Sequence, residues 1–162
     1  LESIDGCDIA NYNSPVQFVI SGESSAVDTA ITALSDAGAK RVVPLSVSGA
    51  FHSPLMASAV GPFKDYLDQF TFNDAKYPII LNRLAAPETN AEQLKENLSL
   101  QIQSSVRWIE SVDYLAQTLP RFIEVGPGKV LSGLIKKMNR EFNVFPTSTV
   151  DGVNAIIKVE VS

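Results

Sequence analysis

The chain has little of the chemistry that metal sites and disulfides require. Its 162 residues include one cysteine, Cys7, and one histidine, His52. A disulfide within the chain is therefore impossible, and a zinc site built from cysteine and histidine ligands is not expected. The lack of an internal disulfide is consistent with a reducing compartment but is weak evidence for one.

Long apolar runs and excess positive charge are also missing. No run approaches the roughly 20 apolar residues of a membrane-spanning helix, and no signal-peptide pattern is visible. The chain has 13 basic and 18 acidic residues, a formal net charge of −5. No basic stripe with interleaved aromatic residues points to a nucleic acid. We expect neither a membrane nor a nucleic-acid partner, and an acidic partner would need a local basic patch.

The composition is that of a globular protein, with 45% hydrophobic and 19% charged residues. The first part predicts two strands, a helix and a third strand, at 8–12, 16–21, 24–38 and 41–46. After His52 the spacing predicts a helix with a kink or break at Gly61-Pro62, a strand at 77–82 and a loop at 85–90. It then predicts helices near 94–102 and 106–118, a strand at 122–125, a helix at 129–140, a strand at 144–149 and a helix at 153–159. This alternation indicates an α/β layer with parallel strands. We therefore divide the chain into residues 1–46, a small α+β part, and residues 47–162, an α/β part.

His52 is a candidate general base. It lies in the segment SGAFHSPLM (48–56), where small residues precede it and a predicted helix follows. Ser53 can cap that helix, and Pro54 suits its first turn. Imidazole is the side chain best suited to proton transfer near neutral pH. The alternative is a capping or core histidine that makes only local hydrogen bonds.

His52 has no evident nucleophile to activate within this sequence. The strand-turn-helix elbow G-x-S-x-G is absent. The nearest segment, GESSA (22–26), lacks the second glycine, and its serines are more simply helix caps. Cys7 has no activating cation beside it in the sequence and is interpreted as buried packing.

The segment EVGPGKVL (124–131) is a strand, a tight turn and a helix start. It matches neither the phosphate-loop pattern G-x-x-x-x-G-K-[ST] nor the dinucleotide pattern G-x-G-x-x-G, so we interpret its turn as structural. Four basic residues gather on the predicted helix: Lys129, Lys136, Lys137 and Arg140. They form either a solvated helix face or a docking site for an acidic partner.

Several motifs in a fixed order resemble one family. They are NYNSPVQ (11–17), AGAKR (37–41) followed by PL (44–45), the His52 segment, Gln101 ahead of VRW (106–108), and EVGPGKVL (124–131). Together they resemble the C-terminal half of the malonyl-CoA:acyl-carrier-protein transacylases. The likeness runs nearly end to end and fades after about Val150.

The resemblance implies a reaction and roles for particular residues. A serine is malonylated by malonyl-CoA and passes the malonyl group to the phosphopantetheine thiol of acyl carrier protein. His52 would be the base, and the backbone carbonyl of Gln101 would orient it. Asn82 would line the active site, and Phe51 would favour malonyl over methylmalonyl. The basic residues Lys129, Lys136, Lys137 and Arg140 stay candidates for docking the carrier protein on their charge alone. Malonyl-CoA is then a substrate, and no cofactor or metal is implied.

The resemblance also implies an incomplete fold. Residues 47–162 would be the C-terminal part of a hydrolase-like α/β domain. Residues 1–46 would be a ferredoxin-like α+β subdomain without its first strand, with Leu1 inside its first helix. The family's serine elbow, oxyanion-hole segment and malonyl-binding arginine would lie upstream. We therefore expect these 162 residues to be inactive alone, and to expose strand edges and apolar surface meant for an N-terminal half.

Two alternatives stay open. The chain could be a non-catalytic module that docks an acidic carrier protein through the helix at 129–140. It could also be a fragment of an acyltransferase domain from a polyketide or fatty-acid synthase. The expected location is the bacterial cytoplasm, or a plastid or mitochondrion in a eukaryote.

Overall fold

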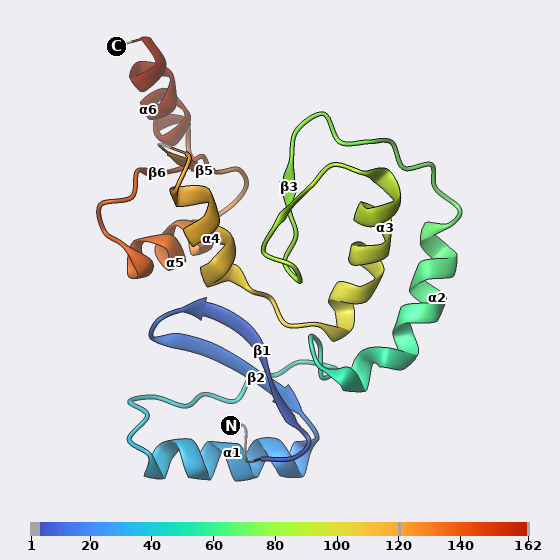
Figure 1. The fold of residues 1–162 in the computed structure, drawn as a ribbon. Coiled ribbons are helices and arrows are strands. Elements are labelled where there is room, and N and C mark those ends of the chain that lie inside the picture. The colour runs from blue at the N-terminus through green and yellow to red at the C-terminus, as the bar shows by residue number, and fades with distance from the viewer. Residues whose placement is uncertain (1–3, 120, 162) are drawn as a thin grey trace.

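The computed structural model describes residues 4–119 and 121–161. These residues form a mixed α/β fold in three neighbouring groups (Figure 1). One group is a β-hairpin with a helix, the second is two helices with a very short hairpin, and the third is three helices with a short parallel sheet. The expectation that Leu1 lies inside a helix falls outside the described residues.

The first group confirms the sequence prediction for two strands and a helix. Strands β1 (Cys7–Ser14) and β2 (Gln17–Gly22) pair antiparallel, and helix α1 (Ser24–Asp36) follows them. Cys7, Ala26 and Ala30 form a small core in this group. Burial raises the pKa of the Cys7 thiol, which suits a packing residue and not a nucleophile.

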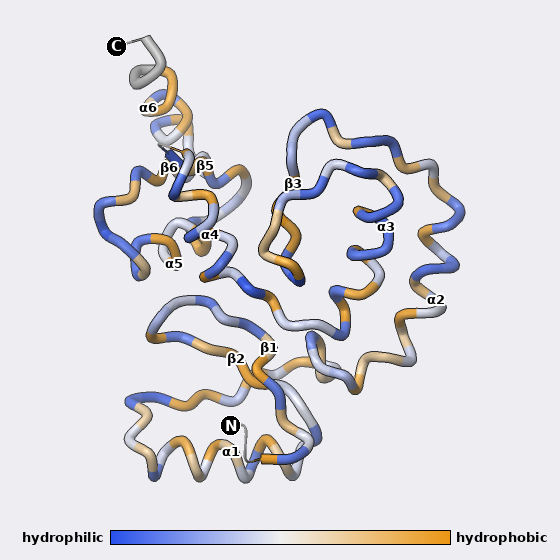
Figure 2. Tube along the Cα trace, in the orientation of Figure 1, coloured by the Kyte–Doolittle hydropathy of each residue, from blue (hydrophilic) through white to orange (hydrophobic). Residues whose placement is uncertain are grey.

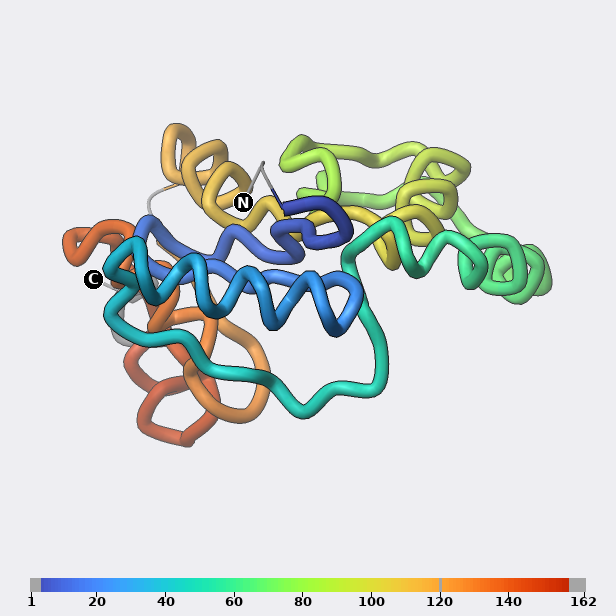
Figure 3. Tube along the Cα trace, turned by 90° about the horizontal axis from the view of Figure 1, so that it is seen from below, coloured from blue at the N-terminus to red at the C-terminus, as the bar shows by residue number. Residues whose placement is uncertain are grey.

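The predicted strand at 41–46 is wrong. Residues 41–47, which we name the strap, have no regular secondary structure and no strand partner in the described part of the chain. Pro44 has no N–H to donate, and a strand needs a neighbour to form its ladder. Val43, Leu45 and Val47 are 50%, 61% and 66% exposed. Figure 3 shows the strap within the long connection that leads from α1 toward the green helices, and Figure 2 shows apolar stretches along it.

The second group begins directly after His52. It consists of a 3-10 turn η1 (Pro54–Met56), α2 (Ala57–Leu67), β3 (Ile79–Ile80), β4 (Pro87–Glu88), α3 (Ala91–Leu100) and a second 3-10 turn η2 (Gln101–Gln103). Two predictions are corrected here. The helix is not interrupted at Gly61-Pro62, because Pro62 and Ser58 are exposed and water can bond the Ser58 carbonyl that Pro62 leaves without a donor. The predicted loop at 85–90 contains β4, which pairs antiparallel with β3.

The third group contains the parallel strands. Its elements are α4 (Trp108–Ala116), β5 (Phe122–Glu124), α5 (Val130–Met138), β6 (Val144–Pro146) and α6 (Val150–Val161). The pair β5 and β6 is parallel, as predicted for this part of the chain. The N–H of Tyr12 in β1 donates to the Val106 carbonyl at 2.9 Å, which ties the hairpin to the segment before α4. The division into domains at residues 46 and 47 stays a prediction.

A lipid bilayer could not be spanned by any helix found in the described residues, since none is both long and apolar enough.

Candidate active site

His52 lies where the connection after the strap meets η1, and two backbone carbonyls fix its ring. The Nδ1 atom is 2.9 Å from the carbonyl oxygen of Gln101 and 3.2 Å from that of Ser104. A carbonyl oxygen only accepts hydrogen bonds, so Nδ1 must carry the proton in the neutral ring. The lone pair is then on Nε2. This geometry is that of a base acting through Nε2, with its orientation supplied by neutral acceptors.

The carbonyls that meet His52 come from the end of a helix. Helix α3 ends at Leu100 and passes into η2, and the last carbonyls of a helix have no partner within it. His52 supplies two donors at this end, because its backbone N–H also donates to the Ile102 carbonyl at 2.9 Å. The Ser104 hydroxyl donates to the Leu100 carbonyl at 2.9 Å and holds the turn. The structure therefore brings Gln101 and His52 together, while the catalytic role of both stays a prediction.

Phe51 and Asn82 are placed less tightly than this pair. Phe51 precedes His52 and is 44% exposed. Asn82 is exposed in the turn after β3, and its backbone carbonyl accepts from the N–H of Arg107 at 2.9 Å. Arg107 also bonds Glu110, and this contact lowers the pKa of the Glu110 carboxyl. The turn at Asn82 is thus anchored through its backbone, and the roles of Phe51 and Asn82 in binding remain predictions.

Sequence reasoning missed the role of Glu124. Its carboxylate accepts from the N–H groups of Leu131 and Ser132 at 3.0 and 2.8 Å, and from the Ser132 hydroxyl at 2.5 Å. The hydroxyl is the main reason that the pKa of Glu124 is lowered. Glu124 thus caps the N-terminus of α5 across the turn. A bound phosphate is not needed there, because the Glu124 carboxylate occupies the anion position at the helix N-terminus. In the sequence, only the spacing between Glu124 and the start of the helix could have indicated this cap.

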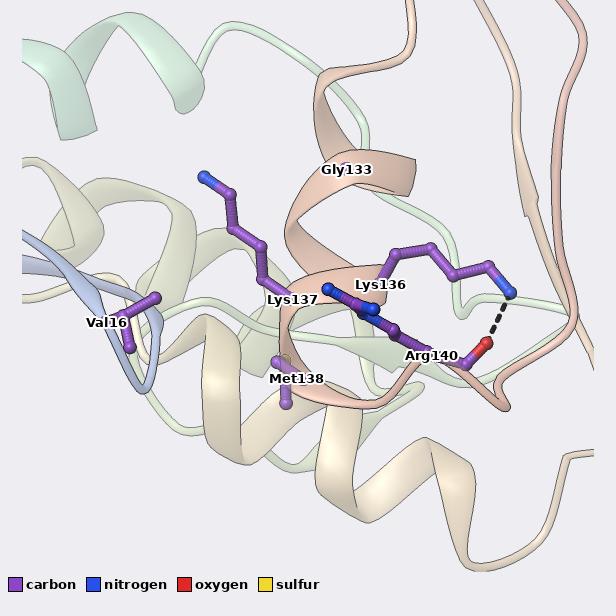
Figure 4. Close-up of a pocket in the computed structure, with 6 residues that line it drawn as sticks. All are labelled: Val16, Gly133, Lys136, Lys137, Met138 and Arg140. Carbon is purple, nitrogen blue, oxygen red and sulfur yellow. Dashed lines mark hydrogen bonds between the residues drawn. The ribbon is translucent and has the colours of Figure 1, made fainter.

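The four basic residues separate into one group of three and one apart. Lys136, Lys137 and Arg140 line an open pocket of about 700 Å³ together with Val16 (Figure 4). Lys129 lies at the opposite end of α5, before its first turn. Lys136 Nζ donates to the Arg140 carbonyl at 2.8 Å, and Lys137 Nζ donates to Gln17 Oε1 at 2.6 Å. Part of the positive charge therefore already has partners within the chain.

No protein-family model matches the chain. It is 45% identical over 145 residues to the malonyl CoA-acyl carrier protein transacylase of Staphylococcus aureus strain COL, a match that covers 89% of this chain and 47% of the relative. The chain is homologous to malonyl CoA-acyl carrier protein transacylases. It spans about half the length of the curated transacylases that it matches.

Solved transacylases share the fold. The acyl-carrier-protein S-malonyltransferase of Bartonella henselae superposes with a TM-score of 0.91 at 36% identity, covering 96% of this chain and 50% of the relative. A malonyl-transacylase in complex with a type II polyketide synthase acyl-carrier protein superposes with a TM-score of 0.89 at 32% identity, covering 94% and 50% of the two chains. The similarity therefore extends over nearly all of this chain and half of each transacylase.

In the described residues, no three His, Cys, Asp or Glu side chains gather to hold a metal ion.

Proposed function

We propose that this chain supplies the general base of a malonyl-CoA:acyl-carrier-protein transacylase. The observation that carries the proposal is the ring of His52, whose Nδ1 faces the Gln101 and Ser104 carbonyls and leaves Nε2 as the proton acceptor. The curated relatives are named malonyl CoA-acyl carrier protein transacylases, which supports this function. A polyketide role is the second candidate, because one solved neighbour is the malonyl-transacylase of a type II polyketide synthase carrier protein. The chain's proposed location is the cytoplasm of a bacterium, because the curated transacylases that it matches are bacterial.

The proposed reaction has two half-steps in which Nε2 carries one proton. First, Nε2 takes the proton of a serine hydroxyl as its oxygen attacks the malonyl thioester, the carbon–sulfur bond breaks, and the CoA thiolate receives that proton. Second, Nε2 takes the proton of the phosphopantetheine thiol, the sulfur attacks the serine ester, and the serine oxygen leaves with the proton. Gln101 and Ser104 keep Nε2 aimed at the reacting atoms throughout.

The sequence contains no serine elbow, so the serine of this proposal comes from a first partner, the complementary half of a transacylase. The accessible surface is 10,760 Å², about 2,900 Å² above that of a compact 17.5 kDa protein. This excess is well above the roughly 800 Å² that one partner contributes to a standard interface. Apolar residues account for part of it, including Val43, Leu45, Val125 and Val130. A surface of this size fits a permanent partner better than a transient one.

The second partner is acyl carrier protein. Lys136, Lys137 and Arg140 present positive charge in one pocket, and an acidic carrier protein is the partner that this charge suits. Lys129 would add a separate contact at the other end of α5. Phe51 beside the base would contact the malonyl group, and Asn82 would line the same site. No part of this arrangement needs a bound cofactor.

Malonyl transfer tests the function directly. The chain alone, and the chain mixed with the half of the Staphylococcus aureus transacylase that it does not match, are given malonyl-CoA and acyl carrier protein. We expect malonyl-acyl carrier protein only from the mixture. Transfer by the chain alone would show that the nucleophile lies within it, and carrier-protein binding without transfer by the mixture would favour the non-catalytic module.

A further inference from the structure

His52 adopts a backbone conformation that residues other than glycine rarely take. Its φ is 62°, and among the described non-glycine residues only Ala85 also has a positive φ. This left-handed conformation costs free energy in a residue with a Cβ, so contacts around it must hold it. The conformation brings both donors of His52, its N–H and Nδ1–H, to the same turn η2.

The next residue supplies a contact across His52. The Ser53 hydroxyl donates to the Ala50 carbonyl at 2.7 Å, and the Ser53 side chain is fully buried. In an ordinary turn, a backbone N–H three residues on makes this bond. Ser53 takes the N-cap position that the sequence predicts, and Pro54 follows at the start of η1, but the Ser53 side chain makes no capping hydrogen bond. The hydroxyl is committed to the turn that carries His52.

From these contacts we propose that Ser53 is a positioning residue for His52. Its hydroxyl closes the turn from Ala50 to Ser53 and holds the left-handed backbone of His52 in place. Without that bond the backbone can relax to an ordinary φ, and the ring then moves away from the Gln101 and Ser104 carbonyls. The proposal rests on the proposed function only for the use made of Nε2; the positioning itself is a property of this chain.

The tautomer of His52 tests the proposal without any catalysis. Because His52 is the only histidine, a long-range ¹H–¹⁵N spectrum of the ¹⁵N-labelled chain shows one imidazole. We expect the neutral ring to be predominantly Nδ1–H in the wild type. In Ser53→Ala we expect a mixture in which the Nε2–H form becomes comparable with the Nδ1–H form.

Ser99 provides a matched control. Its side chain is 1% exposed, and its hydroxyl donates to the Glu96 carbonyl three residues back at 2.7 Å, within α3. Ser99→Ala should lower the unfolding temperature in the same way as Ser53→Ala and leave the His52 tautomer unchanged. A merely structural role for Ser53 would move only the unfolding temperature. An equal tautomer shift in Ser99→Ala would therefore overturn the proposal.

A second variant keeps the buried space filled. Ser53→Cys places a much weaker donor at the same position and should shift the tautomer in the same direction as Ser53→Ala. A wild-type imidazole spectrum in either folded variant contradicts the proposal. In the assembled enzyme, Ser53→Ala should lower kcat about 10-fold or more with KM for malonyl-CoA unchanged, since a misplacement of about 1 Å can cost about 10²-fold. If Ser53→Ala leaves the tautomer unchanged while the wild-type mixture transfers malonyl, the positioning role is refuted and the proposed function stands. If Ser53→Ala shifts the tautomer while the wild-type mixture transfers no malonyl, the transfer function is refuted and the positioning role stands.

Discussion

At His52 the ring is oriented by the backbone, and no carboxylate among the described residues bonds it. The histidine of a serine hydrolase triad is commonly held by an aspartate, whereas here two carbonyls at the end of a helix hold Nδ1. A backbone acceptor cannot be removed by changing its own side chain. The orientation that Gln101 gives to the His52 ring should therefore be independent of the Gln101 side-chain amide.

Gln101→Ala tests that expectation. The carbonyl remains in η2, so the Nδ1–H tautomer should persist, and the transfer rate of the assembled enzyme should stay far above that of His52→Ala. The spectrum of the single imidazole and steady-state transfer rates are measured side by side. A rate as low as that of His52→Ala would show that the Gln101 side chain, and not its carbonyl, acts in the reaction.

Glu124→Gln tests the cap of α5 through its pH dependence. The pKa of Glu124 is lowered in the folded chain, mainly by the Ser132 hydroxyl, so its stabilisation is present above the unfolded pKa and is lost as the pH falls through the folded pKa. We expect Glu124→Gln to lower stability at pH 7 by about 0.5–2 kcal/mol, the usual range for an N-cap. The difference from wild type should shrink below about pH 4.

Thermal unfolding at several pH values measures this difference. Glu92→Gln is the control, because Glu92 is exposed in the first turn of α3 and should show little change. A wild-type stability for Glu124→Gln at pH 7 would mean that the carboxylate does not stabilise the helix.

Among the elements, the strap differs from what local sequence favours. Val43 and Leu45 alternate with other residues as in a strand, and both are exposed in a segment that pairs with no strand in the described part of the chain. Propensity describes the residue, but a strand also needs a neighbour that supplies hydrogen bonds. The short pair β3 and β4 illustrates the reverse, because Pro87 and Glu88 disfavour strands and still pair with Ile79 and Ile80.

Most elements followed from apolar spacing, and the site followed only in part. The hairpin, α1 and the parallel pair β5 and β6 were predicted, since their periodicity is local. The position of Gln101 beside His52 came from resemblance, because the contact spans 49 residues and no local pattern encodes it. The Ser53 and Glu124 contacts were missed because each side chain bonds backbone groups on the other side of a tight turn. Such turns depend on φ values that sequence does not display.

Leu45→Lys tests the strap as part of the surface for the complementary half. Because Leu45 is 61% exposed, the change should alter the stability of the chain by no more than about 0.5 kcal/mol. Association with the complementary half should weaken at least 10-fold, since a buried unpaired charge is unfavourable. Isothermal titration measures the binding, and Ser46→Lys at the next position is the control. Unchanged affinity for Leu45→Lys would place the interface elsewhere.

For the whole molecule, the large accessible surface and the half-length match to transacylases both support a partner that completes the fold. The described residues hold His52 and the turn that orients its ring, and the chain's sequence offers no serine elbow. Groups that one half of a divided site already positions need not be ordered when the halves associate, which lowers the free-energy cost of assembly. The carbonyls of η2 already orient His52 within this chain, so that half of the geometry is in place.

The most direct test of the account is the rate at which the complementary half becomes malonylated on its serine. Intact-mass spectrometry follows this half after mixing with malonyl-CoA and either the wild-type chain or His52→Ala. The account predicts rapid malonylation with the wild-type chain and a rate about 10²–10⁴-fold lower with His52→Ala, the usual scale of general-base catalysis. Malonylation at the same rate with both chains would contradict the assignment of His52 as the base.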